Sequence, residues 1–169
     1  MAAGSIAAAD CVRRRNTLTF ETHSAAQTQA LGAALAAQLQ PDDVLLMLGD
    51  MGAGKSEFTR GLARGLGVTG YVTSPTFTLM QLHDTGRLPL YHFDWYRLSD
   101  VEELYELSMD EYLHAGGVAV IEWPSRAEEA IPDTYLEVSI EPVDDQTRRI
   151  TFTRVGDFHE LDQKGLTLL

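Results

Sequence analysis

The stretch VLLMLGDMGAGKSEF, residues 44–58, decides the fold. Its first five residues are continuously apolar, as is typical of a strand buried on both faces of a parallel sheet. The pattern GxxxxGK[ST] follows that strand directly. A helix is expected over about 54–66, because Phe58, Leu62 and Leu66 recur at helical spacing. Strand, glycine-rich loop and helix therefore follow in the order that a phosphate-binding loop requires.

Each residue type in this loop suits contact with a nucleotide. Glycines let the backbone approach a phosphate closely, and successive N–H groups at a helix N-terminus attract its negative charge. Lys55 is expected to reach the β and γ phosphates, and the Ser56 hydroxyl to bind Mg²⁺. The alternative is a glycine-rich turn with a solvated lysine. The residues predicted to contact the nucleotide here are Asp50, Met51, Gly52, Ala53, Gly54, Lys55, Ser56 and Glu57.

The remaining patterns predict one mixed sheet flanked by helices. Expected strands are 16–21, 44–48, 76–82, 88–95, 118–121, 135–141 and 148–154. Expected helices are 24–39, 54–66 and 100–114, with a helical turn or two over 125–130. Two pairs of these runs each surround a polar turn and are typical of hairpins: 76–82 with 88–95, and 135–141 with 148–154. The hairpins add antiparallel strands to the parallel ones.

We therefore predict a single α/β domain of the P-loop NTPase type, with a mixed parallel and antiparallel sheet. A chain of 169 residues is an ordinary length for one core. We place this domain at 16–156, after a disordered N-terminal tail at 1–15. Residues 157–169 carry too little pattern to predict a structure and are treated as a C-terminal tail.

Two acidic residues stand where apolar strands are expected to end. Glu122 follows the run 118–121, and Asp94 ends the run 90–93. Ligands of open α/β sheets gather at the carboxyl ends of the strands, so either carboxylate could serve Mg²⁺. Glu122 could instead face solvent, and Asp94 could position water or cap the next segment. The predicted catalytic residues are Lys55, Asp94 and Glu122, with Ser56 and Glu122 as the metal ligands.

Two further residues are candidates for nucleotide contact. Trp123 follows Glu122 and could stack on a base, although it could equally fill the core. Thr76 lies in Ser74-Pro75-Thr76, where a hydroxyl could sense a γ-phosphate in a nucleotide switch. Read alone, that tripeptide is also typical of an ordinary turn.

Composition limits the partners and the compartment. The net charge of −12, from 13 basic and 25 acidic residues, opposes non-specific binding to DNA or RNA. A single cysteine excludes an internal disulfide and a cysteine-based zinc site. No apolar run approaches the roughly 20 residues that span a bilayer, and the N-terminus is unlike a secretory signal. These observations predict a cytoplasmic protein that does not bind membranes.

Four motifs taken together resemble the bacterial TsaE (YjeE) family. They are GDMGAGKSEFTRGL from residue 49, SPTFTL from residue 74, HFDWYRL from residue 92 and IEWP from residue 121. The resemblance implies a slow Mg²⁺-dependent ATPase required to make threonylcarbamoyladenosine in tRNA. It implies ATP and Mg²⁺ as cofactors, TsaD and TsaB as partner proteins, and contact with tRNA only through them.

The resemblance also implies roles for individual residues. Lys55 would hold the phosphates, Ser56 and Glu122 the Mg²⁺, and Asp94 would be the essential acidic residue. Residues 74–78, which include Thr76, would form the switch-like segment, and Trp123 would lie beside the nucleotide. Two other readings of the loop remain open: a small-molecule kinase, which needs an acceptor pocket and usually an arginine-rich lid, and a nucleotide-gated binding module without turnover.

Overall fold

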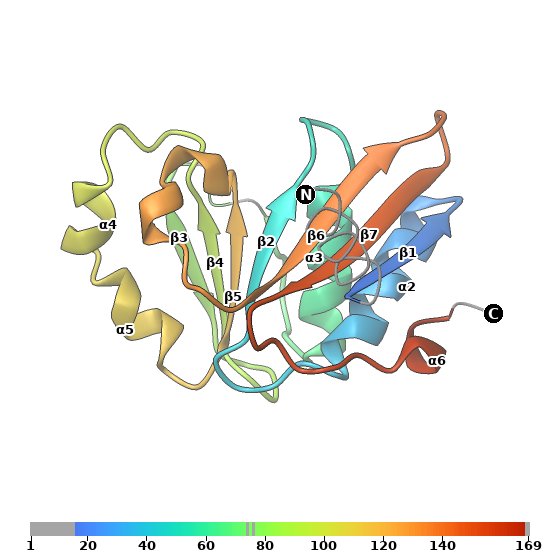
Figure 1. Ribbon diagram of the computed structural model, residues 1–169, viewed down its shortest axis with the longest axis horizontal. Coiled ribbons are helices and arrows are strands. Elements are labelled where there is room, and N and C mark those ends of the chain that lie inside the picture. Colours follow the sequence, from blue (N-terminus) through green and yellow to red (C-terminus); the bar gives the residue numbers. More distant parts are fainter. Residues whose placement is uncertain (1–15, 74, 76, 168–169) are drawn as a thin grey trace, which may run out of the picture.

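The computed structural model describes residues 16–73, 75 and 77–167, which form a seven-stranded sheet with helices on both faces (Figure 1). The strands are β1 (Thr17–Thr22), β2 (Val44–Leu48), β3 (Met80–His83), β4 (Leu90–Asp94), β5 (Val118–Glu122), β6 (Tyr135–Pro142) and β7 (Arg148–Val155). The α-helices are α2 (Ala25–Ala36), α3 (Lys55–Gly65), α4 (Glu102–Glu106), α5 (Met109–Leu113) and α6 (Gln163–Leu166). Two 3₁₀ turns, η1 (Pro124–Arg126) and η2 (Glu128–Ala130), follow β5.

The sheet is mixed, as predicted. Its order is β1-β7-β6-β2-β5-β4-β3. The four middle strands β6, β2, β5 and β4 run parallel, whereas β3, β7 and β1 pair antiparallel with their neighbours. Because the middle strands are parallel, their carboxyl ends meet at one edge, the upper edge in Figure 1. The loop from β2 to α3 lies at that same edge.

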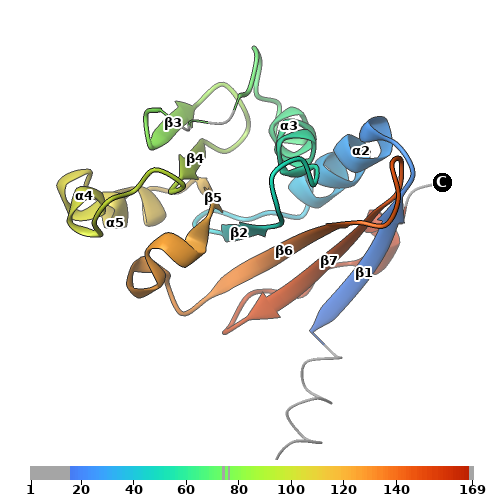
Figure 2. The same cartoon turned by 90° about the horizontal axis from the view of Figure 1, so that it is seen from above.

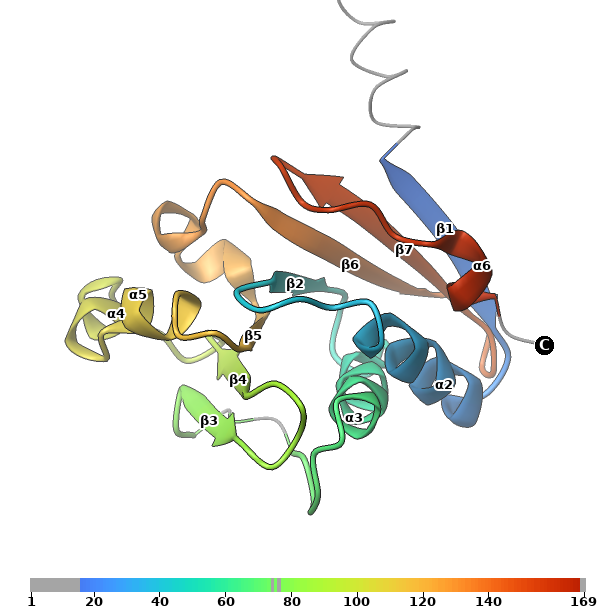
Figure 3. The ribbon, with the colours of Figure 1, turned by 90° about the horizontal axis from the view of Figure 1, so that it is seen from below.

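β2 is buried on both faces, which explains its continuously apolar sequence. Leu45 and Met47 belong to a core beneath α2 and α3, together with residues of β6 and β7. Val44 and Leu46 point the other way, into a second core shared with β4, α4 and α5. Figures 2 and 3 show these two helical layers on opposite faces of the sheet. The strand that precedes the glycine-rich loop is thus held from both sides.

The crossing of α2 and α3 fixes the direction of the helix that follows this loop. Gly61 permits the contact, because a Cβ on Gly61 would lie 1.9 Å from the carbonyl oxygen of Gln29. α2 itself begins as predicted, with the Ser24 hydroxyl accepting from the Gln27 N–H at 3.1 Å. A short turn over residues 37–43 then leads directly into β2.

Two sequence expectations are corrected by the structure. The single helix expected over 100–114 is two short helices, α4 and α5, which are separated at Ser108 with its left-handed φ of 57°. The break lets Leu104 and Met109 both reach the second core. The strand expected over 76–82 begins only at Met80.

The segment after 157 has more structure than its sequence pattern indicates. α6 packs against α2, and Phe158 and Leu166 are buried in the core beneath that helix. In the described part of the chain, no helix is long and apolar enough to cross a membrane.

Candidate functional site

The glycine loop, residues 49–54, joins the end of β2 to the start of α3. Gly49, Gly52 and Gly54 have φ of 149°, 78° and 115°, which side-chain-bearing residues rarely adopt. Gly49 must also lack a side chain because its Cβ would lie 2.7 Å from the carbonyl oxygen of Ile140 in β6. Gly54 is the N-cap of α3, and within the described part of the chain no side chain caps that helix. The loop therefore presents backbone at the N-terminus of an 11-residue helix.

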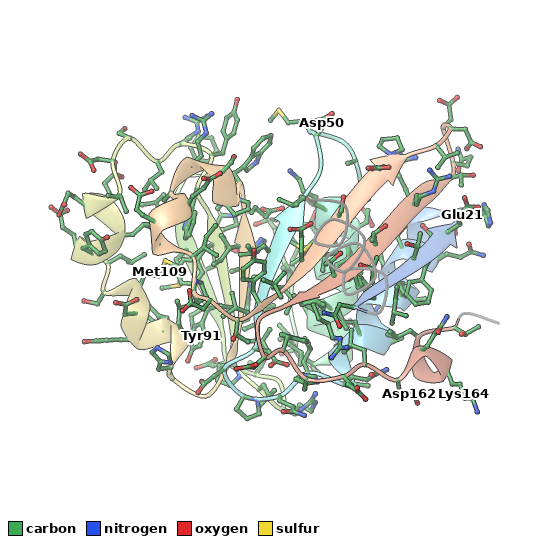
Figure 4. All side chains as sticks on the ribbon, in the orientation of Figure 1. Glu21, Asp50, Tyr91, Met109, Asp162 and Lys164 are labelled. Atoms are coloured by element: carbon green, nitrogen blue, oxygen red, sulfur yellow. The ribbon has the colours of Figure 1, made fainter. Side chains whose placement is uncertain are left out.

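Lys55 is folded back beneath this loop. Its side chain is buried, with 8% of the residue surface exposed, and Nζ donates to the Gly49 carbonyl oxygen at 2.6 Å. Burial lowers the pKa of Lys55, while the nearby carboxylates of Glu122, Asp94 and Asp50 act in the opposite direction. The charges of three acidic residues therefore act on this one buried amino group. Figure 4 shows Asp50 at the crest of the loop.

Glu122 and Asp94 lie side by side at the carboxyl ends of adjacent strands. They are register partners in the parallel pair β4–β5, and each is almost fully buried. Glu122 Oε2 lies 3.2 Å from Nε2 of His92, so the alternative of a solvent-facing glutamate is wrong. Asp94 Oδ1 accepts from the Tyr96 N–H at 2.9 Å, so Asp94 does cap the following turn. That contact leaves Asp94 close enough to act on the charge of Lys55.

Trp123 lies beside Lys55 and is partly buried, packed against the second core. Its backbone is left-handed, with φ of 58°, and its ring centroid lies 5.0 Å from that of Tyr96. Lys55 Nζ lies 4.0 Å from the centroid of the indole ring. Beside them is a pocket of about 190 Å³. It is lined by Met47, Leu48, Gly49, Asp50, Lys55, Trp123, Pro124 and Ser125.

Other predicted residues lie at the edge of this site or outside the described residues. Ser56 is exposed in the first turn of α3, and the Met51 side chain is 73% exposed. The Glu57 carboxylate is held by Gln29 and Arg60, each at 2.5 Å, so it faces α2 and α3 and not the pocket. Thr76, predicted to sense a phosphate, lies outside the described residues, as does Ser74.

Two contacts at the site were missed by reasoning from the sequence. The first is the contact between His92 and Glu122. The position of His92 on the same face of its strand as Asp94 could have suggested that His92 lies at the site. Arg148, at the start of β7, donates through Nε to the Ala53 carbonyl oxygen at 2.8 Å. No local pattern indicates that second contact, because it depends on how β7 and β6 lie beside β2.

The donor chemistry fits a magnesium ion that is shared with a nucleotide. Among the residues the structure describes, no group of three or more His, Cys, Asp or Glu could hold a metal ion by itself. Mg²⁺ in phosphate sites typically takes only one or two protein oxygens, with phosphates and water completing its shell. The Ser56 hydroxyl and the Glu122 carboxylate are oxygen donors of that kind.

The fold and this arrangement define a single-domain α/β protein with a mixed sheet and a glycine loop between a buried strand and a helix. Comparisons with known proteins agree. A family model described as "Threonylcarbamoyl adenosine biosynthesis protein TsaE" matches residues 22–150. The chain belongs to the TsaE family, as its four motifs predicted.

Individual relatives cover most of the chain. It is 44% identical over 144 residues to the tRNA threonylcarbamoyladenosine biosynthesis protein TsaE of Bacillus subtilis, across 85% of this chain and 90% of the relative. The Treponema pallidum protein of the same name is 38% identical over 130 residues, across 77% and 96%. The crystal structure of Bacillus subtilis YdiB matches with a TM-score of 0.72 and 40% identity, covering 83% of this chain and 87% of YdiB.

Proposed function

We propose that this protein binds ATP with Mg²⁺ in the glycine loop and hydrolyses it during formation of threonylcarbamoyladenosine on tRNA. The observation that carries the proposal is the buried Lys55 cation, held between the glycine loop and the strand-end carboxylates of Glu122 and Asp94. A lysine beneath a glycine loop at a helix N-terminus is the arrangement that binds nucleotide phosphates. The family to which the chain belongs supports the link to tRNA modification.

The residues would divide the work by their positions. The backbone N–H groups of the loop and the Lys55 ammonium would bind the phosphates. Lys55 would then donate to a phosphate oxygen in place of the Gly49 carbonyl oxygen. Ser56 and Glu122 would hold Mg²⁺, which when bound supplies positive charge to the phosphate oxygens. Trp123 would lie against the base. Asp94 or Glu122 would orient the attacking water, and substitution of each residue in turn distinguishes the two.

Hydrolysis by the isolated chain is proposed to be slow and to depend on partners. Both candidate bases are already engaged, Asp94 by the Tyr96 N–H and Glu122 by His92. We propose TsaD and TsaB as those partners, in the cytoplasm where tRNA is modified. The net charge of −12 favours contact with tRNA through them and disfavours direct contact.

Phosphate release from Mg-ATP tests the proposal. The chain alone should release phosphate slowly, and addition of TsaD and TsaB should raise the rate. Lys55→Ala, which loses the charge-assisted phosphate contact, provides the blank. Release that is unaffected by both partners would contradict partner dependence.

The same assay separates the two alternative functions. Release of ADP that requires an added nucleoside or sugar would identify a kinase. Complex assembly that needs ATP but releases no phosphate during turnover would identify a binding module. Neither result is expected.

A further inference from the structure

Arg148 and Arg149 are consecutive residues of β7 whose side chains lie on opposite faces of the sheet. Arg148 shares its face with Ile150 and Phe152, which are buried in the core beneath α2 and α3. Arg149 lies on the other face, where its Nη2 is 3.4 Å from Oε1 of Glu21. Figure 4 shows Glu21 near the end of β1, away from the glycine loop. Strand alternation thus directs only the first arginine to the loop.

The Arg148 guanidinium links the β6–β7 turn to the glycine loop. Its Nε donates to the Ala53 carbonyl oxygen at 2.8 Å, and its Nη1 donates to the carbonyl oxygens of Asp144 and Thr147 at 2.8 and 3.1 Å. The turn is itself fixed, because Asp144 Oδ1 accepts from the N–H groups of Gln146 and Thr147 at 2.9 and 2.7 Å. The arginine therefore has a defined position before any ligand binds.

This contact determines the orientation of one peptide plane. The carbonyl of Ala53 and the N–H of Gly54 belong to the same planar trans peptide and point in opposite directions. Since Arg148 holds the oxygen, the Gly54 N–H points away from Arg148. Among the residues the structure describes, no acceptor is found for that N–H.

The glycine makes such support necessary. Gly54 has φ of 115°, and glycine reaches positive and negative φ with similar ease. The peptide before it can therefore rotate at little cost, which would turn the carbonyl oxygen toward the place of a phosphate. An anion site requires the opposite orientation, with the N–H toward the ligand.

We propose that Arg148 is a positioning residue for nucleotide binding, which holds the Ala53–Gly54 peptide with the Gly54 N–H facing the phosphate site. The inference rests on the proposed function and adds a residue that does not touch the nucleotide. Without this contact, binding must order the peptide, and that cost appears as lower affinity. Turnover of the bound complex should change less, because Lys55, Asp94 and Glu122 are untouched.

The matched pair Arg148→Ala and Arg149→Ala tests the proposal, because both variants remove one arginine from the same strand. Two quantities are measured for each: the Mg-ATP dissociation constant by calorimetry, and the ¹⁵N chemical shift of the Gly54 amide in the nucleotide-free protein. Arg148→Ala should weaken binding about tenfold or more and shift the Gly54 signal. Arg149→Ala should leave both near wild type. KM for ATP should rise more than kcat falls.

A second pair removes any ambiguity from poor folding of Arg148→Ala. Asp144→Ala should loosen the turn that holds Arg148. Asp145→Ala, which changes the exposed neighbouring residue, serves as the control. Weaker Mg-ATP binding by the first variant alone supports the proposal. Equal binding by the two variants contradicts it.

Failure of this inference is distinguishable from failure of the proposed function. If wild type binds Mg-ATP and Arg148→Ala binds it equally well, the positioning role is overturned and the proposed function stands. If wild type does not bind Mg-ATP, the proposed function fails. The Gly54 shift of the free protein then still decides whether Arg148 orients that peptide.

Discussion

Lys55 lies against the face of Trp123, with its Nζ 4.0 Å from the centroid of the indole ring. The contact joins the first residue of α3 to the residue directly after β5, and so couples the two halves of the site. A cation over an indole ring is an attractive electrostatic contact, and it is stronger where water is excluded. A nucleotide phosphate that takes up Lys55 must compete with this ring and with the Gly49 carbonyl.

The first prediction uses this contact as an optical reporter. The chain has two tryptophans, Trp123 at the site and the fully buried Trp95. Mg-ATP should change the intrinsic fluorescence of wild type because Lys55 leaves the Trp123 ring. Trp95→Phe should keep that change and Trp123→Phe should lose it. If Trp95→Phe loses the fluorescence change and Trp123→Phe keeps it, nucleotide binding acts on the core around Trp95 instead.

The second prediction concerns the pH dependence of stability. Burial lowers the pKa of Lys55 from the ordinary 10.5. Between that lowered pKa and 10.5 the unfolded chain binds more protons than the folded one, so stability from this residue rises with pH. The free energy of unfolding of wild type minus that of Lys55→Met should therefore increase as pH rises through this window.

Urea unfolding from neutral pH to pH about 10.5 measures that difference. The exposed Lys164, the chain's other lysine, supplies the control, and the corresponding difference for Lys164→Met should stay nearly flat. A Lys55→Met difference that falls with pH would show that burial is not the dominant influence on this lysine.

The third prediction separates the two carboxylates. Glu122→Gln should weaken ATP binding in the presence of Mg²⁺ because the variant loses a charged oxygen ligand, and the loss should be at least the roughly 10- to 100-fold typical when even an outer-shell partner of a metal ligand is removed. In EDTA its affinity should equal or exceed that of wild type, since a negative charge near the phosphates is gone. Glu128→Gln makes the same charge change at an exposed position in η2 and should behave as wild type. If Asp94→Asn loses the Mg²⁺ effect instead, the ligand role belongs to Asp94.

Much of the site could be predicted because its signals are local. The stretch 44–58 contains the strand, the loop and the start of the helix in one continuous pattern. Glu122 and Asp94 each follow an apolar run, and parallel pairing then places the two carboxylates together. Burial on both faces of β2 was also readable, because every one of its residues is apolar.

What could not be predicted depends on contacts between distant segments. Arg148 reaches Ala53 only because β6 lies between β7 and β2 in the sheet. Phe158 and Leu166 are too widely spaced to form a helical pattern, although both are buried. Glycine at position 61 weakens a helix pattern, yet it is required by the close approach of Gln29. Ser108 offers no sequence signal for a left-handed residue.

The last prediction tests that break between α4 and α5. Ser108 has φ of 57° and ψ of 45°, a conformation that costs a side-chain-bearing residue about 1–2 kcal/mol and glycine almost nothing. Ser108→Gly should therefore raise the free energy of unfolding, by about 0.5–1 kcal/mol after the greater flexibility of the unfolded glycine chain is counted. Glu111→Gly, at an exposed position in the middle of α5, should lower it by a similar amount. Urea unfolding of both variants measures the signs. Destabilisation by both glycines would indicate one continuous helix over 100–114, in place of two helices meeting at Ser108.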